Sequence, residues 1–499
     1  MPRKKRSGHG CESSDTGLRI DPEWLYAFGP GDLLPPSLAR WRPLLVEGLL
    51  YFLNRLPAHR RWEFLTAQAA LDAGVSPAER LVTLLRQCPT LHKFGQVVAR
   101  QPYLDPALRS RLRSLESLPA DTQTGPIVRR LRASLPGASQ LAIGEAALAQ
   151  GSVAVVLPFS WRESGRVREG VFKVLRPGVV ARLAEELALL DDVAALLTRR
   201  CGELALPALD FRDILDGVGR LLTEEVRLDG EQSNLRAARA FHAQDPRILV
   251  PQLLPWSASW VSAMERVHGT ALAEAVLAPG QQRALATTAM SALLARPFWS
   301  LDDPAVFHGD LHGGNLFVTP ENRLAVLDWA LTARVSKRQR EAVVAAVIGG
   351  LTLDAAQVSS ALARLGSLTC DDRSLLAHVE RSLDCLVAQV RPAGFTWLLA
   401  LLDAIALEGR IRFDAQLSVF RKTWLSLSGV LTDLAGDALP DTVLRNVGMQ
   451  TFLAEWPARW SGASAADQFA THVSNAELVT AMIDGWFAGA RYWRSVWMR

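Results

Sequence analysis

Hydrophobic residues in the first quarter of the chain recur at helical spacing, and prolines interrupt the pattern repeatedly. The clearest run is Trp41–Leu56, which is apolar at helical spacing with polar breaks. Further on, Asp105 and Pro106 are typical of an N-cap and a first helical residue. The pattern therefore predicts a helical segment over residues 21–135.

The pattern changes after residue 138, where short β-prone runs replace the helical spacing. Val153–Pro158 and Val167–Leu175 flank a turn at residues 163–165 and predict an antiparallel hairpin. Lys173 lies in the second run between two apolar residues, so its side chain should point to the opposite face of the sheet from theirs. Two interpretations stay open: a solvated lysine on an open face, or a phosphate-binding group.

Helical spacing returns in two runs, Ala181–Arg200 and Arg212–Ala243. The second run carries Glu225 and Glu231, six positions apart and therefore about 120° apart around one helix axis. Only one of the two can face Lys173 well, and the alternative is that both are solvated. The chain from about residue 271 to 435 is mostly helical in pattern, after a strand-like run that ends at Glu265.

One segment interrupts that helical part, with the sequence His-Gly-Asp-Leu-His-Gly-Gly-Asn over residues 308–315. It is followed by two β-prone runs, Leu316–Thr319 and Leu324–Leu327, around the turn-forming residues 320–323. Centring a hairpin on this turn pairs Thr319 with Leu324. The segment is therefore expected to form a loop, a strand, a tight turn and a returning strand.

The same register places Asn315 opposite Asp328, with Cα atoms about 4.5–5.5 Å apart. An amide oxygen and a carboxylate then converge on one point, which suits Mg²⁺. Asp310 stands upstream of Asn315 with D-x-x-x-x-N spacing, which kinases use for a catalytic aspartate and a Mg²⁺-binding asparagine. We therefore predict a Mg²⁺–nucleotide site, with Asn315 and Asp328 as metal ligands. The alternative is a hairpin whose polar turn residues have no function.

Composition adds limits on the class of protein. With 499 residues, of which 49% are hydrophobic, the chain can bury a large core, and a net charge of +4 gives no case for nucleic acid as partner. The five cysteines are scattered without a C-x-x-C pair, which indicates a reducing compartment and no zinc site. Residues 1–20 are expected to be a disordered basic tail, with contact to anionic lipid as the alternative. No apolar run is long enough to span a membrane.

Taken together, these segments resemble the UbiB/AarF/ADCK family of atypical, protein-kinase-like proteins linked to isoprenoid quinone lipids. The family's K-x-G-Q motif is matched by Lys93-Phe-Gly95-Gln96, ahead of the kinase-like part. The resemblance runs from about residue 91 to 437, and ordinary kinases lack this motif. The other matching positions are the alanine-rich loop Ala146, Ala147, Ala149 and Gln150; the strand lysine Lys173; the helix residues Glu225, Glu231 and Asn234; the hinge residues Met264 and Glu265; and Asp310, Asn315 and Asp328.

The resemblance implies an α+β, two-lobed protein-kinase-like fold with an added N-terminal helical extension and a mostly helical large lobe. The expected domains are the extension at 21–135, a small lobe at 136–268, a large lobe at 269–437 and a C-terminal helical tail at 438–499. It implies ATP and Mg²⁺ as cofactors. Asp310 and Lys173 would be catalytic, the alanine-rich loop and hinge would bind the nucleotide, and Lys93, Gly95 and Gln96 would be regulatory by covering the entry of a protein substrate.

The sequence also departs from the family pattern. The helix motif has Arg227 where the family has an aspartate, the alanine-rich loop has Ala147 where a serine is usual, and Asp328 is followed by Trp-Ala instead of Phe-Gly. The segment at residues 308–315 is similar, too, to small-molecule kinases of the aminoglycoside and choline type. We expect Glu231, whose neighbouring Asn234 is intact, to pair with Lys173 in preference to Glu225.

Three functions stay open from the sequence. The first is an ATPase or atypical kinase that supports isoprenoid quinone or related lipid metabolism, in the cytoplasm or at the inner face of a membrane. The second is a nucleotide-gated lipid-binding scaffold without catalysis, and the third is a small-molecule phosphotransferase. Trp486, Trp493 and Trp497 recur at intervals of seven and four, so they share one helix face that contacts either a membrane surface or the protein core. The sequence does not indicate the oligomeric state.

Overall fold

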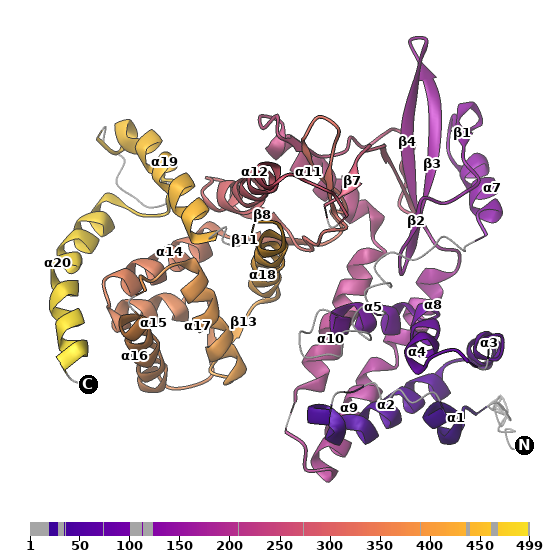
Figure 1. The fold of residues 1–499 in the computed structure, drawn as a ribbon, viewed down its shortest axis with the longest axis horizontal. Coiled ribbons are helices and arrows are strands. Elements are labelled where there is room, and N and C mark those ends of the chain that lie inside the picture. The colour runs from indigo at the N-terminus through magenta and orange to yellow at the C-terminus, as the bar shows by residue number, and fades with distance from the viewer. Residues whose placement is uncertain are drawn as a thin grey trace, which may run out of the picture. The chain divides into compact units, whose positions relative to one another are not determined.

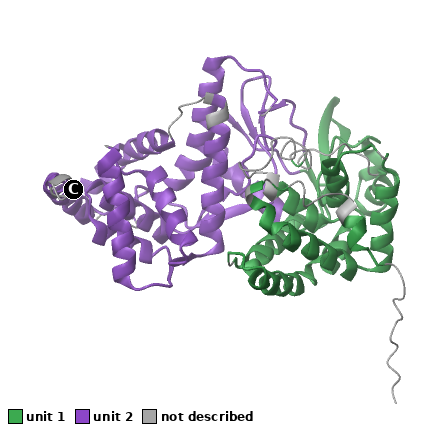
Figure 2. Cartoon of the chain, turned by 60° about the horizontal axis from the view of Figure 1, so that its bottom comes forward, with its two compact units in different colours: residues 1–229, 254–264 green, residues 230–253, 265–499 purple. Residues whose placement is uncertain are grey.

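The computed structural model divides into two compact units, which Figure 2 colours separately. Unit 1 comprises residues 1–229 and 254–264, and unit 2 comprises residues 230–253 and 265–499. The expected basic tail up to residue 18, and all but Leu112 of the helix expected from Asp105, lie outside the described residues. The structure describes residues 19–27, 34, 36–72, 74–99, 112, 123–207, 209–272, 274–389, 391–435, 440–460 and 468–497.

The N-terminal part of unit 1 is helical, as predicted, and it has its own apolar core (Figure 1). Phe52, Leu53 and Phe64 pack there against Leu190 and Val193, all buried. The helices of unit 1 are α1 (Pro22–Ala27), the 3-10 helix η2 (Pro36–Trp41), α2 (Arg42–Arg55), α3 (Ala58–Ala69), α4 (Pro77–Arg86), α5 (Pro89–Ala99), α7 (Gly125–Ser134), the 3-10 helix η4 (Ala138–Gln140), α8 (Val179–Leu187), α9 (Leu190–Glu203) and α10 (Phe211–Glu225).

The predicted β-hairpin is confirmed at the centre of the unit 1 sheet. Its strands pair antiparallel and are longer than predicted, and Ser164 and Gly165 form a two-residue turn with φ of 50° and 79°. Phe172 and Val174 are buried in the core, whereas Lys173 between them lies on the other face of the strand. The strands are β1 (Ala142–Ile143), β2 (Ala149–Gln150), β3 (Ala154–Glu163), β4 (Arg166–Leu175) and β6 (Val261–Glu265), in the order β1-β3-β4-β6 with β2 beside β3.

The single helix predicted over Arg212–Ala243 is wrong. α10 ends at Glu225, and α11 (Leu228–His242) begins after a two-residue break. Leu222 and Leu228 are both fully buried in one apolar cluster, and the break lets both residues reach it. Because Glu225 and Glu231 lie on different helices, the angle of 120° between them does not apply.

Unit 2 holds a four-stranded sheet and most of the long helices. The strands are β5 (Ile248–Leu249), β7 (Thr270–Ala271), β9 (Leu316–Val318) and β10 (Leu324–Val326), in the order β5-β10-β9-β7, with two further pairs, β8 (Ala305–His308) with β11 (Thr332–Val335) and β12 (Gly366–Leu368) with β13 (Ile411–Phe413). The helices after α11 are α12 (Pro279–Met290), the π-helical η5 (Ser291–Ala295), α13 (Arg296–Phe298), α14 (Lys337–Leu351), α15 (Ala355–Ala363), α16 (Asp372–Gln389), α17 (Phe395–Leu407), α18 (Ala415–Ala435), α19 (Pro440–Trp460) and α20 (Asn475–Trp497).

The β9–β10 hairpin forms where the sequence predicted it, but its register was wrong by one residue. Thr319 pairs with Arg323 through an N–H to O bond of 3.0 Å, and Val318 pairs with Leu324. Asn322 has a φ of 58°, and this left-handed residue closes the loop in three residues instead of four. Asn315 therefore stands opposite Leu327, and the backbone N–H of Leu327 donates to the Asn315 carbonyl at 2.9 Å.

Within the part of the chain that the structure describes, no helix has both the length and the apolar character that a membrane crossing requires.

Candidate functional site

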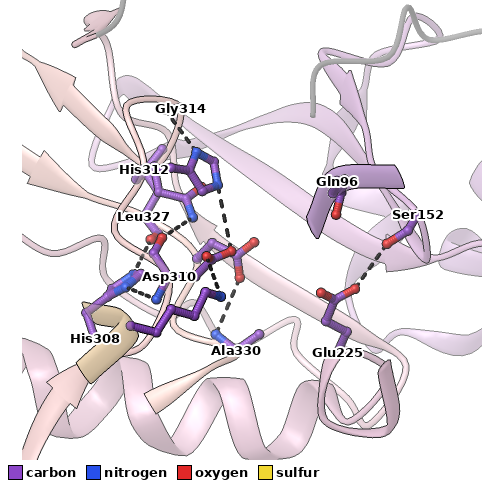
Figure 3. Close-up of polar contacts among 12 residues, drawn as sticks. Gln96, Ser152, Glu225, His308, Asp310, His312, Gly314, Leu327 and Ala330 are labelled. Atoms are coloured by element: carbon purple, nitrogen blue, oxygen red, sulfur yellow. Dashed lines mark hydrogen bonds and ion pairs between the residues drawn. The ribbon is translucent and has the colours of Figure 1, made fainter. Parts of the chain in front are cut away.

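His308 fixes the backbone of the loop that joins β8 to β9 in unit 2 (Figure 3). Its ring is 1% exposed, with Nε2 2.9 Å from the Leu327 carbonyl, while Nδ1 accepts the backbone N–H of Asp310 at 3.2 Å. Because Nδ1 is an acceptor, the neutral ring carries its proton on Nε2 and donates it to Leu327. Burial lowers the pKa of His308 and keeps the ring neutral. His308 therefore supports the loop through backbone hydrogen bonds.

Asp310 presents its carboxylate to two basic side chains of unit 2. Lys422 of α18 places its Nζ 3.0 Å from Oδ1, and the Nε2 of His312 lies 3.9 Å from Oδ2. The other ring nitrogen of His312 accepts the backbone N–H of Gly314 at 3.1 Å, which fixes the ring. The Asp310 side chain is 18% exposed, so it can reach a ligand while its position is held.

Asn315 and Asp328 lie next to one another along the backbone ladder despite the altered register. The amide nitrogen of Asn315 donates to the Asp310 carbonyl at 3.1 Å, which leaves the amide oxygen of Asn315 to face elsewhere. Asp328 has a φ of 55°, in the left-handed region that aspartate tolerates better than most residues, and its Oδ1 accepts the N–H of Ala330 at 3.3 Å. The backbone N–H of Leu327, the residue before Asp328, donates to the Asn315 carbonyl. These bonds hold the backbone of Asn315 close to that of Asp328.

Asn234 of α11 ties down the segment that follows Asp328. Its amide nitrogen donates to the Trp329 carbonyl at 3.1 Å, and its amide oxygen accepts from Arg334 at 3.1 Å. Glu231 on the same helix is 2% exposed, so its carboxylate is not on a solvated face. The motif on α11 therefore supports the backbone around Asp328, a role that the sequence did not predict for Asn234.

In unit 1, Glu225 joins two of the predicted motifs. One carboxylate oxygen forms an ion pair with Lys93 of α5, and the other accepts the Ser152 hydroxyl at 3.0 Å. The Lys93 and Glu225 side chains are 11% and 20% exposed. Gln96 lies on the same helix as Lys93, with its amide nitrogen 3.3 Å from the His92 ring. Glu225 is thus committed to Lys93, and the expected pairing of Lys173 with Glu231 stays a prediction.

The alanine-rich loop ends in a short hairpin. Ala149 and Gln150 form β2, which pairs with β3, and Gly151 donates its N–H to the Ala154 carbonyl at 2.8 Å across the turn. Ser152 stands in this turn, so its bond to Glu225 attaches the tip of the loop to α10. Ala146 and Ala147 precede β2, and their Cβ groups leave a phosphate less room than bare glycine backbone would.

Lys173 pairs with Val156 in the β3–β4 ladder, and Val156 pairs on its other side with Ala149 of β2. The strand β6 predicted over Trp260–Glu265 is present, and the boundary between the two units falls between Met264 and Glu265. The N–H of Glu265 donates to the Gln252 carbonyl at 2.8 Å. The N–H of Glu265 is therefore already used within the protein and is not available to a ligand at β6.

Residues 140–362 match the family model of the ABC1 atypical kinase-like domain. This part of the chain belongs to the UbiB/ADCK family of atypical kinase-like proteins. The mixture of helices and small sheets in this domain fits the expected α+β class. The family model ends before α18, so it does not include Lys422.

Relatives of this UbiB/ADCK chain occur in bacteria and plants. A probable protein kinase UbiB of Xanthomonas euvesicatoria pv. vesicatoria is 26% identical over 395 residues, which are 74% of this chain and 68% of the relative. An uncharacterized protein of Mycobacterium tuberculosis is 29% identical over 267 residues, 50% of this chain and 52% of the relative. The chloroplastic Protein ACTIVITY OF BC1 COMPLEX KINASE 3 of Arabidopsis thaliana is 26% identical over 269 residues, 52% of this chain and 36% of the relative.

Among solved structures, the complex of a Mycobacterium tuberculosis protein with erythromycin matches 69% of this chain and 87% of its own, at 18% identity and a TM-score of 0.41.

The donor set at the β9–β10 hairpin fits Mg²⁺. Within the described residues, no three His, Cys, Asp or Glu side chains are grouped so as to hold a metal ion by themselves. Mg²⁺ in phosphotransferases does not need such a group, because one or two protein oxygens, water and the substrate phosphates complete its shell. Asn315 and Asp328 supply an amide and a carboxylate oxygen of the hard type that Mg²⁺ prefers.

The structure adds two residues that sequence reasoning missed in this UbiB/ADCK chain. Lys422 lies 112 positions after Asp310, and Ser152 lies 73 positions before Glu225. Lys422 belongs to no local motif, and Ser152 stands just after the alanine-rich loop without being one of its matching positions. The only available sign of Lys422 was its place on a helix beside the buried Thr423. A lysine in that place is ordinary for an amphipathic helix and does not indicate a functional residue.

Proposed function

We propose that this chain binds Mg·ATP and transfers or hydrolyses its terminal phosphoryl group. The observation that carries the proposal is the bonded framework of the loop, in which Asn315 and Leu327 share a backbone bond and His308 bonds to Leu327 and Asp310. Phosphoryl transfer depends on positioning and charge neutralisation more than on covalent chemistry. A rigid loop that presents one carboxylate, one amide and a second carboxylate suits that demand.

The roles follow from the contacts within each unit and from the family resemblance. Asn315 and Asp328 would hold Mg²⁺, which neutralises phosphate charge when bound. Asp310 would orient the attacking oxygen of water or an acceptor hydroxyl, at the 2.6–3.2 Å that such contacts need. In unit 1, Lys173 would pair with the α- and β-phosphates, and the alanine-rich loop would cover the nucleotide beside the hinge at Met264.

Lys93 and Glu225 support a regulatory role for the K-x-G-Q segment. The ion pair, together with the bond from Ser152 to Glu225, connects α5, α10 and the tip of the alanine-rich loop within unit 1. We propose that this connection holds the segment of Lys93, Gly95 and Gln96 in a position that disfavours protein phosphorylation. ATP hydrolysis, or phosphoryl transfer to a small lipid acceptor, then becomes the favoured reaction.

Family membership supports a role in ubiquinone-related lipid metabolism, with an isoprenoid lipid or quinone precursor as the partner. A scaffold that binds lipid in a nucleotide-dependent way would use the same Mg·ATP site without turnover. A small-molecule phosphotransferase is disfavoured by the K-x-G-Q motif and by the family match over residues 140–362.

The outward face of α20 favours contact with a membrane surface. The helix packs on α14 and α16 through its other side, where Arg491 bonds to the Thr352 carbonyl at 2.8 Å and lies 3.7 Å from Asp484. Both charged groups therefore face the body of unit 2. The exposed large apolar and aromatic side chains of α20 are Val479, Met482, Ile483, Trp486, Phe487, Tyr492 and Trp493, and Glu477 in the first turn is exposed as well.

Trp486 is 89% exposed and Trp493 is 61% exposed, so the alternative that these rings form ordinary core is wrong; the Trp497 side chain lies outside the described residues. Tryptophan and tyrosine are enriched where a bilayer meets water, and an apolar helix face can enter that region. The last residues of the sequence add arginines at 494 and 499, which suit anionic headgroups. We therefore propose a bilayer surface as the occupant of this face.

The test of the proposed function combines turnover with metabolite analysis. Full-length protein is assayed for Mg²⁺-dependent ATP hydrolysis with and without a quinone-like phenol and liposomes, and a deletion strain is profiled for lost quinone or accumulated precursor. We expect turnover that Asp310→Asn abolishes, and a metabolic defect that the Asp310→Asn gene does not repair. Binding of Mg·ATP without turnover, with repair by the Asp310→Asn gene, would favour the scaffold instead.

A further inference from the structure

A helix from outside the residues that the family model matches contacts the loop that carries Asp310 in unit 2. The family model covers residues 140–362, whereas α18 spans Ala415–Ala435. Three residues on one face of α18 contact the loop. These are Val419, Lys422 and Thr423, at i, i+3 and i+4.

The first and last of these contacts fix the loop's backbone. Thr423 is 0% exposed, and its hydroxyl donates to the His308 carbonyl at 2.8 Å. A Cβ added to Gly309 would meet the Cγ1 of Val419 at 2.9 Å and the Leu331 carbonyl at 2.9 Å, so the glycine lets helix and loop approach closely. Lys422, which lies between these two contacts, therefore extends from a backbone that is fixed against the loop.

The contact that Lys422 makes is the ion pair with Asp310, with Nζ 3.0 Å from Oδ1. The side chains are 33% and 18% exposed, so the pair is half-buried at the edge of the loop. The Nε2 of His312 lies 3.9 Å from the Oδ2 of Asp310, too far for a hydrogen bond. Lys422 thus makes the close charged contact to the candidate catalytic carboxylate.

We propose that Lys422 is a positioning residue for the reaction: its ammonium holds the Asp310 carboxylate in the orientation that accepts the attacking hydroxyl or water. The proposal rests on the proposed phosphoryl-transfer function. It makes α18 a functional part of the active site, although Lys422 lies beyond the residues that the family model matches. Because a lysine holds the carboxylate through one charged contact from a fixed helix, an arginine can replace it in part and a methionine cannot.

The turnover experiment uses a double-mutant cycle in the full-length chain. We expect Lys422→Met to lower kcat by about 10–100-fold, since misplacement of a catalytic group by about 1 Å costs on the order of 10²-fold, with the Kd for Mg·ATP changed less than about 3-fold. Lys422→Arg should recover part of the loss. In the Asp310→Asn background, Lys422→Met should have little further effect, because the group that it positions is already lost.

The matched control is Arg364→Met, which removes one exposed positive charge from unit 2 at the end of α15 and should leave kcat unchanged. A kcat for Lys422→Met within about twofold of wild type would overturn the proposal, as would an equal loss in the wild-type and Asp310→Asn backgrounds. Either result would mean that the lysine does not act through Asp310.

A second readout separates this proposal from the proposed function. Wild type, Lys422→Met, Asp310→Asn and the double variant are also compared by Tm. Lys422→Met should lower the Tm by about 2 °C or more in the wild-type background. The decrease should be clearly smaller in the Asp310→Asn background, because the carboxylate that loses its cation is absent there. Equal Tm losses in both backgrounds would refute the pair whatever the turnover. Equal turnover by wild type and Asp310→Asn would refute the proposed function, and with it the positioning role, while the Tm cycle would still report on the pair.

Discussion

Lys93 of α5 and Glu225 at the end of α10 form an ion pair within unit 1, and the same carboxylate accepts the Ser152 hydroxyl. The pair joins residues separated by 132 positions and links the K-x-G-Q helix to the tip of the alanine-rich loop. Both carboxylate oxygens of Glu225 are therefore engaged within unit 1, one by Lys93 and the other by Ser152.

Removing this pair should release the K-x-G-Q segment. Lys93→Ala leaves the half-buried Glu225 carboxylate without its cation, and we expect a loss of about 1–3 kcal/mol in the free energy of unfolding. We also expect higher autophosphorylation, measured as phosphate incorporated from labelled ATP. Glu225→Gln should have the same effect, whereas Lys93→Arg keeps the charge and is the control. Unchanged autophosphorylation in both Lys93→Ala and Glu225→Gln, with the proteins folded, would show that the pair has no inhibitory role.

His472 should make the folded state sensitive to acid. Burial lowers its pKa to about 3; the hydrogen bond to the Phe298 carbonyl opposes this shift, and the charges of Arg340 and Lys337 add to it. The unfolded chain takes up this proton near pH 6.5, whereas the folded chain does so only near pH 3. Stability is therefore lost as pH falls through that window, at about 1.4 kcal/mol per pH unit, and is unaffected above it.

The measurement is urea unfolding of wild type and His472→Gln at pH 7 and pH 5. Glutamine can donate a hydrogen bond to Phe298 but does not titrate. The variant should lose about 2 kcal/mol less than wild type between the two pH values. Parallel losses in the two proteins would mean that the ring is not held neutral in the folded state.

The α20 face should bind lipid bilayers. We expect the double variant Trp486→Ser/Trp493→Ser to lose most of its co-sedimentation with anionic liposomes while its Tm stays close to wild type, because both rings are exposed. Trp62→Ser is the matched control, since Trp62 is 62% exposed on α3 in unit 1. Undiminished liposome binding by the double variant would remove α20 as the lipid contact. Loss of a dimer in size-exclusion chromatography would show that a second copy covers this face.

Features that depend on neighbours in the sequence could be predicted. The β3–β4 hairpin follows from alternating apolar residues around Ser164 and Gly165, and the loop and hairpin at residues 308–327 follow from their turn residues. The register failed by one residue because Asn322 adopts a left-handed conformation, which shortens the loop. Residue types alone did not distinguish a three-residue from a four-residue turn there.

Features that depend on distant packing could not be predicted. The break between α10 and α11 arises because Leu222 and Leu228 share one buried cluster, and helical periodicity continues across it in the sequence. Lys422 reaches Asp310 from 112 positions away, and a lysine on an amphipathic helix carries no local sign of its partner. Spacing identifies the residues that a single loop presents, but not those that a separate helix brings to it.

The most direct test of the central claim is the affinity for Mg·ATP measured by isothermal titration calorimetry on wild type and Asp328→Asn. The account predicts binding by wild type that requires Mg²⁺, and a loss of most of that Mg²⁺-dependent binding in Asp328→Asn, while circular dichroism and Tm show the fold intact. Arg364→Met is the control and should bind as wild type does. An unchanged Kd for Mg·ATP in a folded Asp328→Asn protein would contradict the assignment of Asn315 and Asp328 as the metal site.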